Sequence, residues 1–388
     1  MNLNHPKIIK ELLLPIVIVI AVYVVLIAVY IHPYQYKLSS LVKFDVQEPN
    51  YRPELIPSGT VVFQGNGYDG QYNFYIIKDL WFRGTFTDAF RYQRVLYPIL
   101  VDLLAFGNNN LIFVSFILIN FISIIFGIIY LRKLIGQSCK SSWLILYGLN
   151  LGFVFGVLYD LGTPVAIGGI VISLYYLLKN RVGLTALFLA ISMLTMENAV
   201  LVIVPLILYF LWKKEWQKSG ILSISFIPWF VWQCILWNRF GIIPILASSG
   251  VITVPFYGIV QQIISIIQTQ YTGLLAFLRQ TNVVWILLFV VASMLISIYH
   301  FKRNKDLYSW LILFHAIFGI CLSQTMIWTH TITSPARVLS GMFPLAILMY
   351  SQYQTDKWGK LLIYFIWLLT LLGILRIFML PIHPYFIT

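Results

Sequence analysis

The chain has 388 residues, of which 60% are hydrophobic and only 10% are charged, and its mean hydropathy is +0.85. A soluble domain of this length carries about 25% charged residues, so a soluble protein is excluded and a helical membrane protein is expected. The net charge of +13 does not indicate a nucleic acid partner, because the basic residues stand between apolar runs, where membrane topology explains them.

Apolar runs that can cross a bilayer, which takes about 20 helical residues, recur along the whole sequence. We expect an all-α polytopic protein with about eleven (roughly ten to twelve) transmembrane helices in one domain, 1–388. The first run is too long for a signal-peptide core and lacks a clear cleavage site, so a retained first helix is expected. The expected spans are 11–31, 110–131, 142–158, 163–178, 183–196, 199–212, 220–238, 283–300, 308–328, 338–351 and 360–378.

Two segments do not fit simple spanning helices. Residues 32–109 are expected to form a large first external loop, whose portion 72–104 is rich in aromatic residues and suits helices at the membrane interface. Residues 240–282 form a second expected external loop, with an amphipathic stretch at 257–278.

The distribution of basic residues predicts the orientation. With the N-terminus in the cytoplasm, the short cytoplasmic loops hold 15 Lys and Arg residues and the external side holds 4, the first long loop being left out. Short loops rich in Lys and Arg stay inside. We therefore expect a protein of the cell (plasma) membrane with both long loops, and hence any site they form, on the external face.

No sequence pattern indicates a cofactor. Cys139, Cys234 and Cys321 are far apart, so zinc and redox motifs have no support. Neither an Asp-x-Asp pair nor a Walker-type glycine loop occurs, which leaves nucleotide binding without support. A divalent metal is possible, but nothing in the sequence indicates one.

The most polar stretch of the chain begins at Gly67-Tyr68-Asp69-Gly70-Gln71-Tyr72. Asp69 has two interpretations. It can cap a helix that begins at Gln71, or it can be a carboxylate held in a pocket to accept a proton.

Arginines follow in Arg91-Tyr92-Gln93-Arg94-Val95-Leu96-Tyr97-Pro98. Arg91 and Arg94 are three residues apart and share one face of a helix. They can contact lipid headgroups or form a guanidinium fork that grips a phosphate.

Further polar residues fall at the expected outer ends of helices. Asp160 can cap the following helix or face the same pocket as Asp69. Glu197 interrupts an apolar region, where ionisable groups are functional candidates, although a plain turn would also explain it. Arg337 is a candidate anion ligand, and His330 is either a further ligand or a solvated loop residue.

The order of the elements and the motifs around Asp69 and Arg91 resemble those of known membrane proteins. A first helix, a large external loop with an acid and then many helices are similar to the GT-C class of membrane glycosyltransferases. Tyr68-Asp69-Gly70-Gln71-Tyr72, with the run from Arg91 to Pro98, resembles a bacterial family of cell-surface glycopolymer formation proteins. The resemblance extends through Asp160-Leu161, Pro164, Leu194-Thr195, Glu197 and Arg337-Val338-Leu339. The family has arginine at the positions of Tyr159 and Met196 and glutamate at that of Thr163.

The resemblance implies a transferase that takes a sugar from a polyprenyl phosphate, because nucleotide sugars are made inside the cell. The acceptor would be an envelope glycan, a lipid or a protein, and the anomeric centre would be inverted. Asp69 would be the catalytic base, and Arg91, Arg94 or Arg337 would hold the leaving phosphate. Tyr68, Gln71, Tyr72, Asp160, Glu197 and His330 complete the expected substrate-binding set.

Two other functions stay open. A transporter or flippase for lipid-linked saccharides would show inverted repeats and charges at mid-membrane, and neither is clear in the sequence. A non-catalytic scaffold for envelope assembly would explain the departures from the family pattern.

Overall fold

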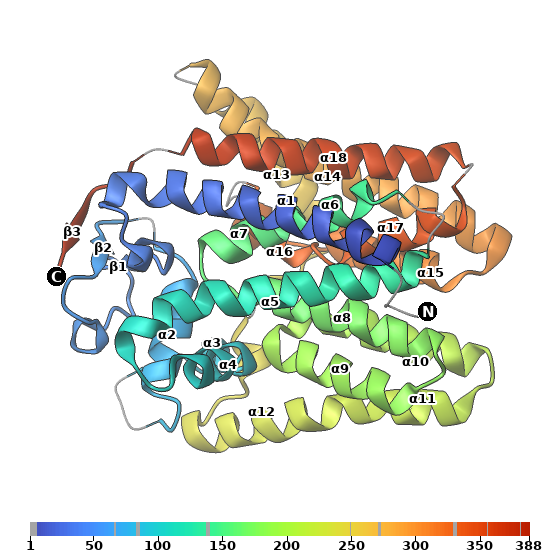
Figure 1. Ribbon diagram of the computed structural model, residues 1–388, viewed down its shortest axis with the longest axis horizontal. Helices are drawn as coiled ribbons and strands as arrows, with labels where there is room; N and C mark the ends of the chain where they lie inside the picture. Colours follow the sequence, from blue (N-terminus) through green and yellow to red (C-terminus); the bar gives the residue numbers. More distant parts are fainter. Residues whose placement is uncertain are drawn as a thin grey trace.

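The computed structural model describes residues 6–65, 67–82, 86–136, 140–248, 250–270, 273–328, 332–354, 356–380 and 382–388. Nearly all regular structure in them is α-helical, as Figure 1 shows. Five helical stretches of the described chain are long and apolar enough to cross a membrane. The helical membrane-protein fold predicted from composition is confirmed.

The longest helices run along the long axis of the molecule (Figure 1). They are α1 (Pro6–Ile31), α5 (Asn109–Ile135), α14 (Leu274–Asn304), α18 (Lys357–Phe378) and the consecutive α11 (Trp216–Ser223) and α12 (Ile227–Phe240). Shorter helices pack between them: α6 (Ser142–Gly148), α7 (Leu151–Leu158), α8 (Thr163–Leu178), α9 (Val182–Thr195), α10 (Val200–Trp212), α13 (Tyr257–Gln268), α15 (Leu307–Ile320), α16 (Thr333–Val338) and α17 (Met342–Gln352).

Some predicted boundaries were wrong. The span expected at 142–158 is two helices, because Asn150 accepts a hydrogen bond from the Gly152 N–H (2.9 Å) and caps α7, while its Nδ2 donates to the Ser340 carbonyl (3.0 Å). The span expected at 308–328 ends as an α-helix at Ile320. Helix α14 begins at Leu274, inside the segment expected to be the second loop.

One end of the molecule is built from the first long loop. Its helices are α2 (Gly70–Lys78), α3 (Ala89–Tyr92) and α4 (Leu96–Ala105). A small sheet joins β1 (Phe44–Asp45), β2 (Val61–Phe63) and β3 (Tyr385–Ile387). Strand β1 pairs in parallel with β2, which pairs antiparallel with β3, so the C-terminal segment holds the loop against the helices. The sequence analysis did not predict these strands.

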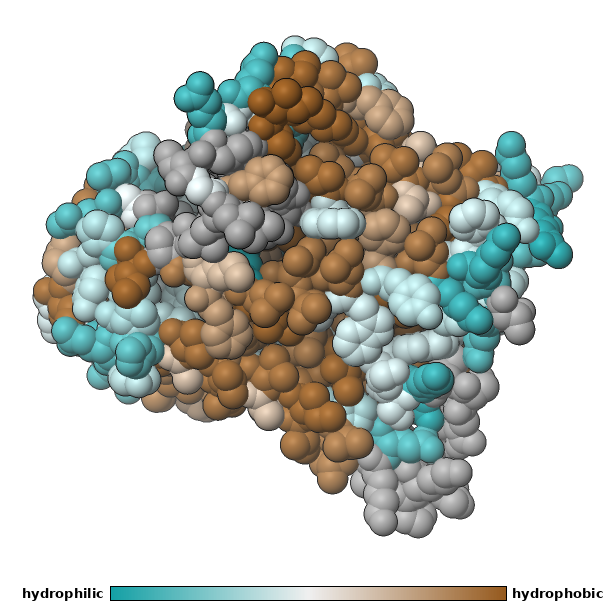
Figure 2. All heavy atoms as spheres, turned by 90° about the horizontal axis from the view of Figure 1, so that it is seen from above, coloured by the Kyte–Doolittle hydropathy of each residue, from teal (hydrophilic) through white to brown (hydrophobic). Residues whose placement is uncertain are grey.

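The surface has a hydrophobic band. Figure 2 shows brown side chains across the middle of one face and hydrophilic side chains gathered at both ends. The first-loop helices and the sheet lie at one end, and the α10–α11 and α14–α15 turns, which carry Lys213, Lys214, Lys302, Arg303 and Lys305, lie at the other (Figure 1). The prediction that this end is cytoplasmic is based on these basic residues together with those of the other short loops.

The orientation can be tested with single cysteines in a variant whose Cys139, Cys234 and Cys321 are replaced by serine. Ser58, an exposed residue at the sheet end, is expected to react as Ser58→Cys with a membrane-impermeant maleimide in intact cells. Asn304→Cys, an exposed position at the other end, should react only after lysis. The reverse pattern would place the sheet end in the cytoplasm.

Candidate active site

A glycine loop connects β2 to α2 and is held by a buried acid. The carboxylate of Asp45 on β1 accepts hydrogen bonds from the Gly65 N–H (2.8 Å) and the Gly67 N–H (2.6 Å). Gly65, Gly67 and Gly70 have the Gly-x-Gly-x-x-Gly spacing of dinucleotide-binding loops, in which backbone N–H groups face a pyrophosphate. Here Asp45 occupies the N–H groups of Gly65 and Gly67, so this spacing does not need a nucleotide.

Gly70 is required by a close backbone contact. A Cβ atom at this position would lie 2.5 Å from the Tyr159 carbonyl oxygen and 2.7 Å from that of Val42, far below an allowed separation. The first turn of α2 is thereby wedged between two other segments. The glycine therefore serves the packing of the loop.

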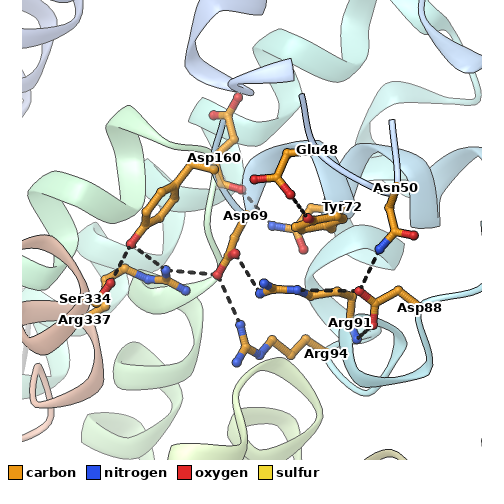
Figure 3. A network of polar contacts seen from close by, with 12 residues as sticks. Glu48, Asn50, Asp69, Tyr72, Asp88, Arg91, Arg94, Asp160, Ser334 and Arg337 are labelled. Atoms are coloured by element: carbon orange, nitrogen blue, oxygen red, sulfur yellow. Dashed lines mark hydrogen bonds and ion pairs between the residues drawn. The ribbon is translucent and has the colours of Figure 1, made fainter. Parts of the chain in front are cut away.

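The side chain of Asp69 is the centre of an ion-pair network (Figure 3). Its Oδ1 lies 2.6 Å from Arg91 Nη1, and its Oδ2 lies 3.1 Å from Arg337 Nη1 and 3.6 Å from Arg94 Nη1. Arg91 belongs to α3, Arg94 follows α3, and Arg337 belongs to α16. One carboxylate thus joins the first loop to a helix from the far end of the sequence.

Asp69 stands at the N-cap position of α2 but does not act as a cap, since its side chain accepts no hydrogen bond from the backbone of that helix. The helix-cap interpretation of Asp69 is wrong for this reason. Both carboxylate oxygens are used by guanidinium groups instead.

Burial and the arginines act in opposite directions on this acid. Burial alone would raise the pKa of Asp69, but the nearby positive charges of Arg91, Arg337 and Arg94 outweigh it and hold the pKa well below its ordinary value. Asp69 is therefore ionised throughout the physiological pH range.

Arg94 is fixed by a second acid. Its Nε donates to Glu197 Oε2 (2.8 Å) and its Nη2 to Glu197 Oε1 (2.5 Å), a bidentate pair. Glu197 begins the short 3₁₀ turn Glu197–Ala199 between α9 and α10. Glu197, which was predicted to bind substrate, contacts Arg94 and orients it toward Asp69.

Arg91 is held from other directions. Its guanidinium carbon lies 4.5 Å from the centre of the Tyr72 ring, and the Tyr72 hydroxyl donates to Glu48 (2.8 Å). The Asp88 side chain accepts from the Arg91 backbone N–H (3.1 Å) and caps α3.

Arg337 also contacts a tyrosine. Its Nη1 donates to the Tyr68 hydroxyl (2.9 Å), which lies 3.4 Å from Ser334 Oγ.

These side chains border a narrow cavity that is open to solvent. Residues from the first loop, α8, the end of α9 and α16 line it: Asp69, Tyr72, Asn73, Arg91, Arg94, Tyr97, Leu161, Gly162, Thr163, Thr195, Met196 and Arg337. Its wall therefore combines one carboxylate, three guanidinium groups and several hydroxyl groups. A phosphate and a sugar match this chemistry.

Two predicted site residues face elsewhere. Gln71 is fully buried and its Oε1 accepts from the Asp45 backbone N–H (3.3 Å), so it supports the loop from behind the cavity. Asp160 adopts a left-handed conformation (φ 48°), and Figure 3 shows its carboxylate pointing away from the arginines. The prediction that Asp160 lines the Asp69 cavity was wrong, because only its carbonyl turns that way and accepts from Asn73 Nδ2 (2.9 Å). His330 lies outside the described residues.

Sequence reasoning missed several residues that shape the site. Asp45, Glu48 and Asp88 each fix a part of the first loop, and Asn73, Tyr97, Thr163 and Thr195 line the cavity. Asn73 lies next to the Gly-Tyr-Asp-Gly-Gln-Tyr stretch, and Tyr97, Thr163 and Thr195 lie within or beside the family motifs, so these four could have been included by proximity. Asp45, Glu48 and Asp88 carry no local pattern that separates them from ordinary loop residues.

A metal site is not apparent in the described part of the chain, where no group of three or more His, Cys, Asp and Glu side chains could hold an ion. Both oxygens of Asp69 face guanidinium groups, which is a poor environment for a cation.

Fold and site together define a helical membrane protein with several spans and an arginine-bound acid at one end. No protein-family model and no curated protein matches this sequence. Among solved structures, the chain is similar to the Archaeoglobus fulgidus oligosaccharyltransferase in its apo form, with 11% sequence identity and a TM-score of 0.40. The match covers 93% of this chain and 55% of that chain, so this chain spans about half the length of that protein. At this TM-score the similarity does not establish a shared activity.

The isolated carboxyl group of Asp160 gives a prediction for stability. It is fully buried, and neither oxygen has a hydrogen-bond partner among the described residues. Burial raises the pKa of Asp160 well above its ordinary value, so the folded protein keeps the proton that the unfolded chain releases above about pH 3.9. The folded state then binds more protons, and its stability falls as pH rises between the two pKa values.

Asp160→Asn, which mimics the protonated acid, should therefore raise the thermal midpoint at pH 7 by about 2 °C or more and leave it unchanged near pH 4. Intrinsic fluorescence of the detergent-solubilised protein measures both. A lower midpoint at pH 7 would mean that Asp160 is charged in the folded protein.

Proposed function

We propose that this protein is a membrane glycosyltransferase that moves a sugar from a polyprenyl phosphate to a hydroxyl group of an envelope glycan, lipid or protein. The proposal rests on the single carboxylate of Asp69, held by three guanidinium groups in a cavity next to the membrane-spanning helices. The resemblance of the Asp69 and Arg91–Pro98 motifs to glycopolymer formation proteins supports the same reaction class.

The site residues supply each element of an inverting transfer. The Asp69 carboxylate takes the proton of the acceptor hydroxyl as that oxygen attacks the anomeric carbon. The bond from the anomeric carbon to the phosphate oxygen breaks, and its electron pair leaves on the lipid phosphate. Arg91 and Arg337 stabilise the charge that develops there.

The three arginines also control the base. While they surround Asp69, its low pKa makes it a weak proton acceptor. A lipid phosphate would draw the guanidinium groups of Arg91 and Arg337 toward its own oxygens, and the pKa of Asp69 would then rise. Binding of the donor thereby raises the pKa of Asp69 and enables it to act as the base. When no donor is bound, Asp69 takes up few protons.

The arginines have different tasks in this proposal. Arg94 is committed to Glu197 by two hydrogen bonds and mainly holds the network in place. Arg337 keeps a buried Nε without a hydrogen-bond partner among the described residues, so it has a donor to offer. Arg91 lies at the other side of Asp69 and completes the clamp.

Asp69→Asn is expected to accumulate in the membrane and to lower sugar transfer by about 10²–10⁴-fold, the usual contribution of a general base. Transfer is measured with the polyprenyl-phosphate sugar fraction extracted from the producing cells. Asp160→Asn is the matched control and should keep activity, because Asp160 does not face the cavity. If Asp69→Asn is unstable, Asp69→Glu keeps the charge, should accumulate and should still transfer poorly. Full transfer by Asp69→Asn would exclude Asp69 as the base, whereas no transfer by the wild type would leave a transporter or a scaffold as the function.

Arg91→Gln should raise the KM for the donor and also change the pH profile. One of the charges that lower the pKa of Asp69 is lost, so this pKa rises and the acid limb of kcat/KM moves to higher pH. Arg239→Gln is the control, since Arg239 donates to the Phe82 carbonyl (2.7 Å) at the same end but does not line the cavity. An unchanged acid limb in Arg91→Gln would argue against Asp69 as the titrating base.

A further inference from the structure

A second small cavity lies near the glycine loop. It opens between the ends of α1 and α18, close to the C-terminal strand (Figure 1). The residues of its wall that matter here are Tyr30, Tyr34, Lys43, Tyr159, Leu380 and His383. Apart from Tyr159, where the resembled family has arginine, none of them was singled out by sequence, and none takes part in the proposed transfer.

Lys43 is an unusual residue for such a position. Its side chain is only 6% exposed, and its backbone is left-handed (φ 64°). The ammonium lies 4.7 Å from the centre of the Phe63 ring, 5.5 Å from that of Tyr159 and 5.8 Å from that of Tyr30. It has no hydrogen bond or ion pair with any described residue, and aromatic faces compensate a buried cation only in part.

No acid among the described residues forms an ion pair with Lys43. Burial lowers the pKa of Lys43 to about 8, and the nearest opposing influence is the carboxylate of Asp45. That carboxylate is already used by the N–H groups of Gly65 and Gly67. A buried charge is costly unless it is paired, so the cavity is suited to an anion that supplies the missing partner.

A second group of the wall can donate to the same anion. The hydroxyl of Tyr30 is buried without a hydrogen-bond partner in the described chain. An oxyanion with several acceptor oxygens, such as a phosphate, would satisfy both an ammonium and a phenol.

Part of the cavity wall is apolar. Leu380 and Ile382 line it together with residues of α1, and Ile382 is 67% exposed. Both bounding helices are membrane-spanning candidates. A ligand that enters here meets apolar surface outside and positive charge inside, which is the pattern of an anionic lipid.

We propose that this second cavity binds the phosphate headgroup of a membrane lipid, with Lys43 as its counter-charge and the hydroxyl of Tyr30 as a hydrogen-bond donor. Between it and the Asp69 cavity lie the rings of Tyr68 and Tyr159, which pack against each other at a tilt of 47° with their centres 4.9 Å apart. Binding at this site is measured without turnover, so the test does not depend on the proposed transfer.

The test uses the full-length protein in dodecyl maltoside, which contains no phosphate, and native mass spectrometry. The probes are dioctanoyl phosphatidic acid, dioctanoylglycerol and inorganic phosphate. Phosphatidic acid should bind the wild type at least about tenfold more tightly than Lys43→Gln, the effect expected for one charged hydrogen bond. Lys43→Arg should retain binding, and Lys360→Gln, an exposed lysine at the far end of α18, should not change it. Dioctanoylglycerol and inorganic phosphate should each bind at least about tenfold more weakly than phosphatidic acid.

Each contrary result overturns a definite part of the proposal. Equal binding to wild type and Lys43→Gln, or equal binding of dioctanoylglycerol, would exclude an anion site at Lys43. Inorganic phosphate that binds as tightly as phosphatidic acid would replace the lipid by a soluble phosphate. Loss of binding in Arg91→Gln but not in Lys43→Gln would move the ligand to the Asp69 cavity. If Lys43→Gln does not fold, Tyr30→Phe, which removes one hydroxyl, decides: it should bind phosphatidic acid more weakly, and unchanged binding would overturn the proposal.

Discussion

The structure of this end of the molecule depends on the contact between the Asp69 carboxylate and three guanidinium groups. Without that carboxylate, Arg91, Arg94 and Arg337 would repel one another in a partly buried space. With it, the first long loop is joined to α16, 268 residues further along the chain. Glu197 extends the network to the turn between α9 and α10 through Arg94. A cavity with fixed positive charge follows directly from this arrangement.

The helices could be predicted from the sequence and their interruptions could not. Hydropathy identifies a run such as that of α5 or α18 because a bilayer-spanning helix must be apolar along its length. The break before Asn150 depends on the carbonyl of Ser340, which lies 190 residues away, and no local pattern reports it. The pairing of β2 with a C-terminal strand is likewise a long-range contact.

The site residues were likewise predictable only in part. Asp69 and the arginines of the first loop could be predicted because acids and arginines cluster there in an otherwise apolar chain. The direction of each side chain could not be predicted. Asp160 lies next to the cavity in sequence, but its left-handed backbone turns the carboxylate away. Asp45 looks like any loop acid until its contacts with Gly65 and Gly67 are seen.

Tyr68 lies between the Asp69 cavity and the Lys43 cavity, the two proposed anion sites. On one side its hydroxyl accepts from Arg337 Nη1. On the other its backbone N–H donates to the Lys43 carbonyl (3.3 Å), and its ring packs against that of Tyr159 at a tilt. Because Asp45 fixes the preceding glycines, Tyr68 has little freedom to shift. The position of Asp69, the next residue, is therefore set by the aromatic wall behind it as well as by the arginines in front. In the proposed reaction, the pKa of Asp69 rises only when the arginines move. Proton transfer is thereby tied to what the arginines bind.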